Sequence, residues 1–158
     1  MSTPAAPAAT CPIARTLEIV GEKWSLLILR DVARGITKFS EIHDSLNCPK
    51  NLLSARLKTL VSAGILAKRE YKEPGARLRS SYHLTEAGAD LLPVLIALQS
   101  WGQAHLDPAE LISTRIFHRE CGGEVHAALT CAHGHHIGAA EIDVEWPELH
   151  QGSGLASG

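Results

Sequence analysis

Two short amphipathic segments separated by three residues constrain the fold of this chain more than any other feature. The first runs over 38–46, where Thr37 is placed to cap a helix, and the second runs over about 50–63 between Pro49 and Gly64. The first segment repeats apolar side chains at helical spacing, namely Phe39, Ile42 and Leu46. Two helices joined by so tight a connection predict a helix-turn-helix.

Two further helices are predicted before this pair. Pro12 suits the first turn of a helix over 13–20 that Gly21 ends. The segment 22–35 is apolar on nearly every side and is closed by Gly35, which predicts a central buried helix. Aromatic residues make up only 4% of the chain, so Leu, Ile, Val and Ala must build the core.

A basic hairpin is predicted after the second segment. The runs 65–71 and 80–84 have strand-like composition, and Pro74 with Gly75 marks the turn between them. Five cations surround this turn: Lys68, Arg69, Lys72, Arg77 and Arg79. A basic hairpin directly after a helix-turn-helix is a wing, although Glu70 and Glu73 can pair with some of its cations.

A long helix is predicted over about 85–105, and its apolar stripe is wider than one small domain needs. The stripe consists of Leu91, Leu95, Leu98 and Trp101, with Val94 beside them. A partner helix is the natural use of such a surface. Beyond it we predict a helix over 111–117 and strands over 124–131 and 137–146.

The charge is divided between two parts of the chain. Residues 1–105 hold 13 Lys and Arg against 9 Asp and Glu, a formal charge of +4, whereas residues 106–158 hold 2 against 8, a charge of −6. This asymmetry separates a part that suits a polyanion from an acidic appendage. We therefore predict a disordered tail over 1–10, a winged helix-turn-helix domain over 11–105, a small β-containing extension over 106–148 and a flexible tail over 149–158.

Other function classes find little support in the residues. The chain has no GxGxxG, P-loop, HExxH or GxSxG motif, so we expect no enzyme. No apolar run approaches the roughly 18–20 residues of a membrane span, and residues 1–10 lack the features of a secretory signal. Four scattered cysteines favour redox sensing or metal binding over a disulfide framework. We expect a cytoplasmic protein.

The helix predicted over 50–63 separates apolar from polar side chains. Leu53, Leu57, Leu60 and Val61 fall on one side, and Asn51, Ser54, Ala55, Lys58 and Ser62 fall on the other. Small or hydrogen-bonding side chains are what a helix needs to lie in a DNA major groove, whereas an ordinary solvated face would carry more Glu and Lys. Lys50 lies at the helix start, where a phosphate is favoured. Arg56 lies at the rim and either reaches phosphate or pairs with an acidic neighbour.

The runs CPIARTLEIVGEKWSLLILRDVARGITKFSEI, NLLSARLKTLVSAGIL and SSYHLTEAGADLLPVLIALQSWG resemble the HxlR-type branch of the winged-helix transcriptional regulators. The resemblance covers about residues 11–105 with order and spacing intact. It implies a dimeric DNA-binding regulator in which the first and last helices form the dimer interface and the fourth helix reads the major groove. Lys38, Phe39 and Ser40 match the start of the family's third helix, although Phe39, like Trp24, suits the core better.

Pattern and resemblance together give the predicted sites. The predicted DNA contacts are Lys38, Ser40, Lys50, Asn51, Ser54, Lys58, Arg77 and Arg79. The predicted dimer contacts are Ile13, Leu17, Leu91, Leu95, Leu98 and Trp101.

Cysteine and histidine residues suggest two further sites, a redox-sensitive thiol and a metal site. Cys11 matches a cysteine that in some family members resembles a sensor of oxidants or electrophiles, and a helix N-terminus favours a thiolate. The alternative is an inert packed thiol, and Cys48 more simply fills a gap. In the extension, His118, Cys121, Cys131 and His136 could form a tetrahedral zinc site. Gly134 stands where the zinc-ribbon tail of some members has a cysteine, so a metal-free remnant is the alternative.

The predicted protein is a homodimeric transcriptional regulator that binds a double-stranded DNA operator. Repression and activation both remain open, and repression is our working prediction. The alternative is a metal- or ligand-binding interaction module that reuses the winged-helix fold.

Overall fold

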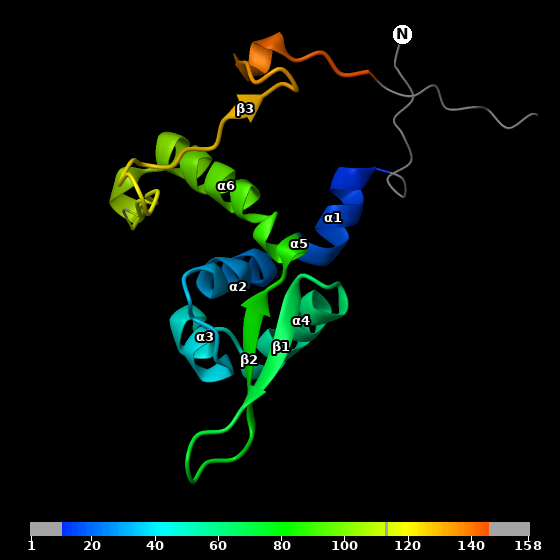
Figure 1. Cartoon of the computed structure of the whole chain (residues 1–158), viewed down its shortest axis with the longest axis vertical. Coiled ribbons are helices and arrows are strands. Elements are labelled where there is room, and N and C mark those ends of the chain that lie inside the picture. Colours follow the sequence, from blue (N-terminus) through cyan, green and yellow to red (C-terminus); the bar gives the residue numbers. More distant parts are fainter. Residues whose placement is uncertain (1–10, 113, 146–158) are drawn as a thin grey trace, which may run out of the picture.

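The computed structural model describes residues 11–112 and 114–145 of the chain. In chain order its elements are α1 (Pro12–Val20), α2 (Lys23–Ala33), α3 (Phe39–Leu46), α4 (Lys50–Ser62), β1 (Leu66–Tyr71), β2 (Arg79–Leu84), α5 (Glu86–Ala89), α6 (Leu92–His105), the short 3₁₀ helix η2 (Pro108–Glu110), β3 (Leu129–Thr130), β4 (His136–Ile137) and the 3₁₀ helix η3 (Ala139–Glu141). This mainly helical fold with a small antiparallel sheet confirms the predicted class. The hairpin β1–β2 protrudes at one end of the molecule, and α6 leads toward the other (Figure 1).

The core lies where α2, α3, α4 and the start of β1 meet. Its members, all buried, are Val20, Ile28, Leu29, Val32, Ile42, Cys48, Leu53, Leu57, Leu60, Ile65 and Leu66. They are aliphatic apart from Cys48, as the scarcity of aromatic residues requires. Trp24 and Phe39 are half-buried and pack against this cluster from its edge.

Helix α3 is attached to the hairpin through the residues that precede it. The backbone N–H of Tyr82 donates to the carbonyl oxygen of Thr37 at 2.8 Å, and Lys38 forms an isolated antiparallel bridge with Ser81. Thr37 therefore does not cap the helix as predicted, because its backbone is taken up by β2. Lys38 occupies the N-cap position, and its N–H donates to a carboxylate oxygen of Glu41 at 3.4 Å.

Thr85 fixes the junction after the hairpin. Its hydroxyl donates to the carbonyl oxygens of Gly64 at 2.6 Å and Ile65 at 3.0 Å, and it accepts from the N–H of Gly88 at 3.1 Å. Gly88 is required at this point, because a Cβ there would collide with the carbonyl oxygen of Ile65. The end of β2 is thus held against the end of α4.

The single helix predicted over 85–105 is wrong in one respect, because the structure divides it into α5 and α6. Pro93 explains the break. Proline has no N–H to donate to the carbonyl of Ala89, so a continuous helix would lose a hydrogen bond at this point. Leu91 lies between the two helices, and Pro93 falls in the first turn of α6, where the missing N–H costs nothing.

The apolar stripe of α6 has two parts with different surroundings. Leu91 and Leu95 are half-buried against the core of their own chain. Leu98 and Trp101, farther along the helix, are 52% and 59% exposed. No residue of α6 is fully buried, so the far part of this helix carries apolar surface that the described residues do not cover.

The segment after α6 differs most from the prediction. The helix expected over 111–117 does not form: η2 ends at Glu110, and the described residues from Leu111 to Phe117 are not helical. The side chains of Gln99 and Gln103 donate to the carbonyl oxygen of Thr114 at 3.0 and 2.8 Å, which ties this backbone to α6. Of the two predicted strands, only the two-residue pair β3–β4 forms within the described residues.

Some predictions fall on residues outside the described part. These are the tails over 1–10 and 149–158 and the end of the strand expected to reach Trp146. Within residues 11–112 and 114–145, no helix has the length and apolar character needed to cross a membrane.

Candidate nucleic-acid interface

Helix α4 presents the polar face that the sequence predicts. Leu53, Leu57 and Leu60 are buried against the core. The opposite side is exposed and consists of Asn51, Ser54, Ala55, Lys58 and Ser62. Lys50 is exposed at the first helical position after Pro49. The predicted exposure of this face is therefore confirmed, whereas its contact with DNA stays a prediction.

Arg56 lies at the rim of this face, where the sequence left two roles open. Its guanidinium pairs with Glu22 just before α2, at 3.3 Å, and is only 26% exposed. The acidic neighbour, not a phosphate, is thus its partner in this structure. The pair connects α4 to the start of α2 and leaves Lys58 and Lys50 as the exposed cations of α4.

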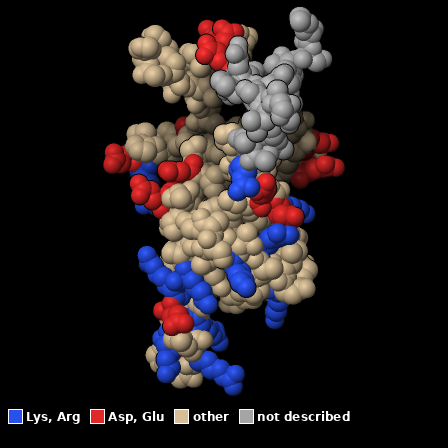
Figure 2. Space-filling view, turned by 90° about the vertical axis from the view of Figure 1, so that its right-hand side faces the viewer, with Lys and Arg blue, Asp and Glu red and all other residues tan. Residues whose placement is uncertain are grey.

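The wing carries five further exposed cations, namely Lys68, Arg69, Lys72, Arg77 and Arg79. Arg77 lies in the loop between β1 and β2, where Gly75 has φ of 75° and the N–H of Ala76 donates to the carbonyl of Glu73 at 3.0 Å. Arg79 begins β2 opposite Tyr71 of β1. Figure 2 shows Lys and Arg side chains on the protruding wing and the body next to it, with most acidic side chains toward the other end.

Lys38 is placed among the wing residues but is not a free cation. Its ammonium lies 3.0 Å from Glu73 and 3.8 Å from Glu41, and 5.3 Å from the centre of the Tyr71 ring. The hydrogen bond and charge of Glu73 raise the pKa of Lys38, and Lys38 in turn lowers the pKa of Glu73. The predicted DNA contact at Lys38 must therefore compete with two carboxylates of its own chain.

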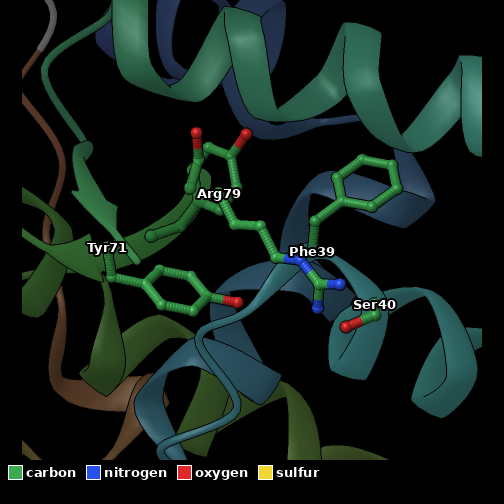
Figure 3. A pocket seen from close by; sticks show the side chains of 6 residues that line it. Phe39, Ser40, Tyr71 and Arg79 are labelled. Carbon is green, nitrogen blue, oxygen red and sulfur yellow. The ribbon is translucent and has the colours of Figure 1, made fainter. Parts of the chain in front are cut away.

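A pocket of about 400 Å³ opens between the start of α3 and the hairpin. It is lined by Phe39, Ser40, Tyr71, Arg79, Ser80 and Tyr82. In Figure 3 the Arg79 side chain crosses the pocket, with Tyr71 on one side and Phe39 and Ser40 on the other. The structure thus brings the predicted site residues Ser40 and Arg79 to one place. Tyr71, Ser80 and Tyr82 were not predicted, because their meeting depends on the strand pairing.

The cysteines occupy four different environments and are all unpaired within the described residues. Cys11 is half-buried at the N-cap of α1. Burial raises the pKa of the Cys48 thiol, which keeps it protonated and favours the gap-filling role. Cys131 is the opposite case, because backbone N–H groups of His133 and His135 lower its pKa.

The predicted zinc site is not assembled within residues 11–112 and 114–145, where no three His, Cys, Asp or Glu residues group as metal ligands. His118 and Cys121 do meet, with Nδ1 3.1 Å from Sγ. Cys131 precedes a separate turn, and His136 lies in β4 opposite Thr130. Two ligands from one turn do not complete a tetrahedral site.

Comparison with known proteins gives one consistent result. The pattern of the HxlR-like helix-turn-helix family matches residues 19–110. An uncharacterized HTH-type transcriptional regulator of Mycobacterium tuberculosis is 36% identical over 134 residues, which cover 84% of each chain. Among solved structures, that of PA1607, a candidate transcription factor, has a TM-score of 0.75 at 33% identity and covers 87% of this chain and 95% of its own. The redox regulator HypR in its reduced form has a TM-score of 0.56 at 26% identity and covers 63% of this chain and 98% of its own.

The Lys38–Glu73 ion pair predicts a change in the pKa of Glu73 when Lys38 is replaced. Lys38→Met removes both the hydrogen bond and the charge that lower the pKa of Glu73, so this pKa should rise toward its ordinary value, although Arg79 still lowers it somewhat. Because the folded-state pKa of Glu73 is lowered, the pair stabilises the fold at neutral pH and this contribution is lost as the pH falls through that pKa. Carboxyl-detected NMR titration in the acidic range measures the shift. Lys50→Met is the matched control, and an unchanged Glu73 titration in Lys38→Met would contradict the pairing.

Proposed function

Since the chain belongs to the HxlR-like helix-turn-helix family of transcriptional regulators, we propose that it binds operator DNA with α4 in the major groove and the β1–β2 wing on the flanking backbone. The observation that carries this proposal is the exposed face of α4. Asn51 and Ser54 on this face are short and can hydrogen-bond base edges, and Lys58 can reach a phosphate. The alternative of an interaction module without an operator is not favoured by relatives that are named transcriptional regulators.

The charges of the wing support the same proposal. Arg77 and Arg79 form no ion pair among the described residues, unlike Lys38 and Arg56. Cations without an intramolecular acid are free to displace the counterions of a DNA phosphate. The wing and Lys58 would therefore provide sequence-independent affinity, and Asn51 would provide sequence preference.

Duplex DNA selected from a random pool by the native chain tests these roles and requires no known operator. Lys58→Ala and Arg77→Ala should weaken binding to every duplex and each reduce the salt slope by about 1. Asn51→Ala should cost about 1–3 kcal/mol on the selected duplex and little on a random one, if it binds an adenine edge. Arg119→Ala, an exposed cation of the extension, is the charge control. Native affinity and salt slope in all three variants would refute the proposal.

We further propose a twofold homodimer built from α1 and the far part of α6. Ile13 and Leu17 on α1 are 71% and 55% exposed, and Leu98 and Trp101 on α6 are similarly uncovered. Exposed apolar side chains of this size on two helices suit a self-complementary interface. Leu91 and Leu95 pack against the core of the same subunit, so they would hold α6 in place beneath this surface.

Leu98→Asp should convert the dimer to a monomer, because it places a charge in an apolar interface. Leu78→Asp makes the same substitution at a wing position of similar exposure, 59% against 52%, and should remain dimeric. Sedimentation at micromolar concentration separates the two results, and the native operator should be an inverted repeat with half-sites about 10 bp apart or a multiple of that. A native chain that sediments as a monomer, or equal behaviour of both variants, would contradict the proposed interface.

Cys11 supports a proposal about control of DNA binding. It lies two residues before Ile13, at the edge of the proposed dimer surface, and the solved relative HypR is described as a redox regulator. Oxidation of the thiol by hydrogen peroxide gives a sulfenic acid and water, and the larger polar group would shift one subunit relative to the other. Such a shift changes the spacing of the two α4 helices without touching either one.

The test compares the affinity for the selected duplex before and after mild peroxide treatment. The native chain should lose affinity, whereas Cys11→Ser should keep it, provided that this variant melts and dimerises like the native chain. Cys131→Ser is the second variant and should respond like the native chain. If instead Cys131→Ser is the insensitive one, or if Cys11→Ser loses affinity as the native chain does, Cys11 is not the sensor.

A further inference from the structure

We propose that the pocket between α3 and the hairpin binds a small aromatic carboxylate, and that the bound ligand competes with DNA. The first part of this proposal, that the pocket binds the ligand, depends only on the pocket. The second part, that the ligand competes with DNA, rests on the proposed DNA-binding function. The pocket of about 400 Å³ is open to solvent on one side, so a small planar ligand would lie against its lining rather than be enclosed by it.

The aromatic composition of the pocket is exceptional for this chain. The whole sequence contains two tyrosines and two phenylalanines, and both tyrosines and one phenylalanine line this pocket. Phe39 comes from α3, Tyr71 from β1 and Tyr82 from β2, so three elements each contribute one ring. All three are half-buried and present ring surface to the pocket. Aromatic rings favour another ring in an offset or edge-to-face arrangement, which points to an aromatic ligand.

The charge of the pocket points to an anion. Arg79 is the one cation among the lining residues, and it forms no ion pair or side-chain hydrogen bond among the described residues. Arg79 lowers the pKa of Glu73 through its charge, but Glu73 forms its ion pair with Lys38, at 3.0 Å. A guanidinium binds a carboxylate through two parallel hydrogen bonds. The Ser40 hydroxyl lies beside the guanidinium end of Arg79 and can donate a third hydrogen bond to the same carboxylate (Figure 3).

The same residues connect the pocket to DNA binding. Ser40 and Arg79 are both predicted DNA contacts, so a carboxylate held between them removes two contacts at once. The Lys38–Ser81 bridge fixes the start of α3 against β2, so the pocket is already formed without a ligand. Competition would therefore be direct, by occupation of shared side chains.

Calorimetric titration of the full chain without DNA tests the first part of the proposal. Benzoate is the probe, cyclohexanecarboxylate keeps its charge without the ring, and benzyl alcohol keeps the ring without the charge. Benzoate should bind at least about tenfold more tightly than either. Arg79→Ala should abolish binding, Arg79→Lys should weaken it because the planar fork is lost, and Arg119→Ala should leave it unchanged. Tyr71→Ala should abolish the preference for benzoate over cyclohexanecarboxylate, and Tyr71→Phe should retain it.

The proposed ligand binding is overturned if benzoate does not bind, if cyclohexanecarboxylate binds equally tightly, or if Arg79→Ala leaves binding unchanged. Inorganic phosphate that binds as tightly as benzoate would also overturn it, because the pocket would then be a seat for the DNA backbone. In a second measurement at constant ionic strength, benzoate should weaken binding of the selected duplex by the native chain and not by Arg79→Ala. Benzoate that binds without weakening DNA overturns the competition, whereas a chain that binds benzoate and no duplex refutes the proposed function alone.

Discussion

The packing of α4 against α2 is the contact on which the other features of this molecule depend. Leu53, Leu57 and Leu60 meet a core that includes Ile28 and Leu29, and all five side chains are at most 1% exposed. Removing one such leucine side chain typically costs about 2–5 kcal/mol, a large part of the total stability of a small domain. Because these three leucines must face inward at helical spacing, the polar side chains between them must face outward. The exposed polar face of α4, which we propose contacts DNA, is thus set by the side chains that face the core.

The second constraint is the attachment of α3 to β2 through the backbone of Thr37 and Lys38. It brings the start of a helix beside the edge of a sheet, where side chains from three elements enclose the pocket. It also brings Lys38 to Glu73 in the wing loop. Both groups are exposed, so this pair orients the wing more than it stabilises the fold. Glu73 neutralises part of the positive charge near the wing by pairing with Lys38. Cations such as Arg77 and Arg79, which form no ion pair among the described residues, therefore supply the charge that remains exposed there.

The features that could be predicted from sequence are those that local patterns determine. The bounds of α1, α2 and α4 follow closely from Pro12, Gly21, Gly35, Pro49 and Gly64, and the exposed face of α4 follows from its leucine spacing. Pro93 was present in the sequence, yet the continuous apolar stripe hid the break it causes. The pocket could not be predicted, because Tyr71 meets Arg79 only through the register of the hairpin. The helix expected over 111–117 does not form; the carbonyl of Thr114 in this segment instead accepts from Gln99 and Gln103, a contact that a local pattern does not contain.

The two proposed control points would act on different terms of DNA binding. An anion in the pocket blocks the proposed DNA contacts of Ser40 and Arg79 within one subunit, without any movement of the chain. It should therefore lower the affinity for every duplex, including one with a single half-site. A modification at Cys11 leaves those contacts in place and alters the relation between subunits, so its effect requires two half-sites and depends on their spacing. Affinity for a duplex with one half-site therefore distinguishes the two control points: a ligand in the pocket should lower it, and modification of Cys11 should not. The pocket lies between α3 and the hairpin, whereas Cys11 precedes α1, so the two control points use different parts of the chain.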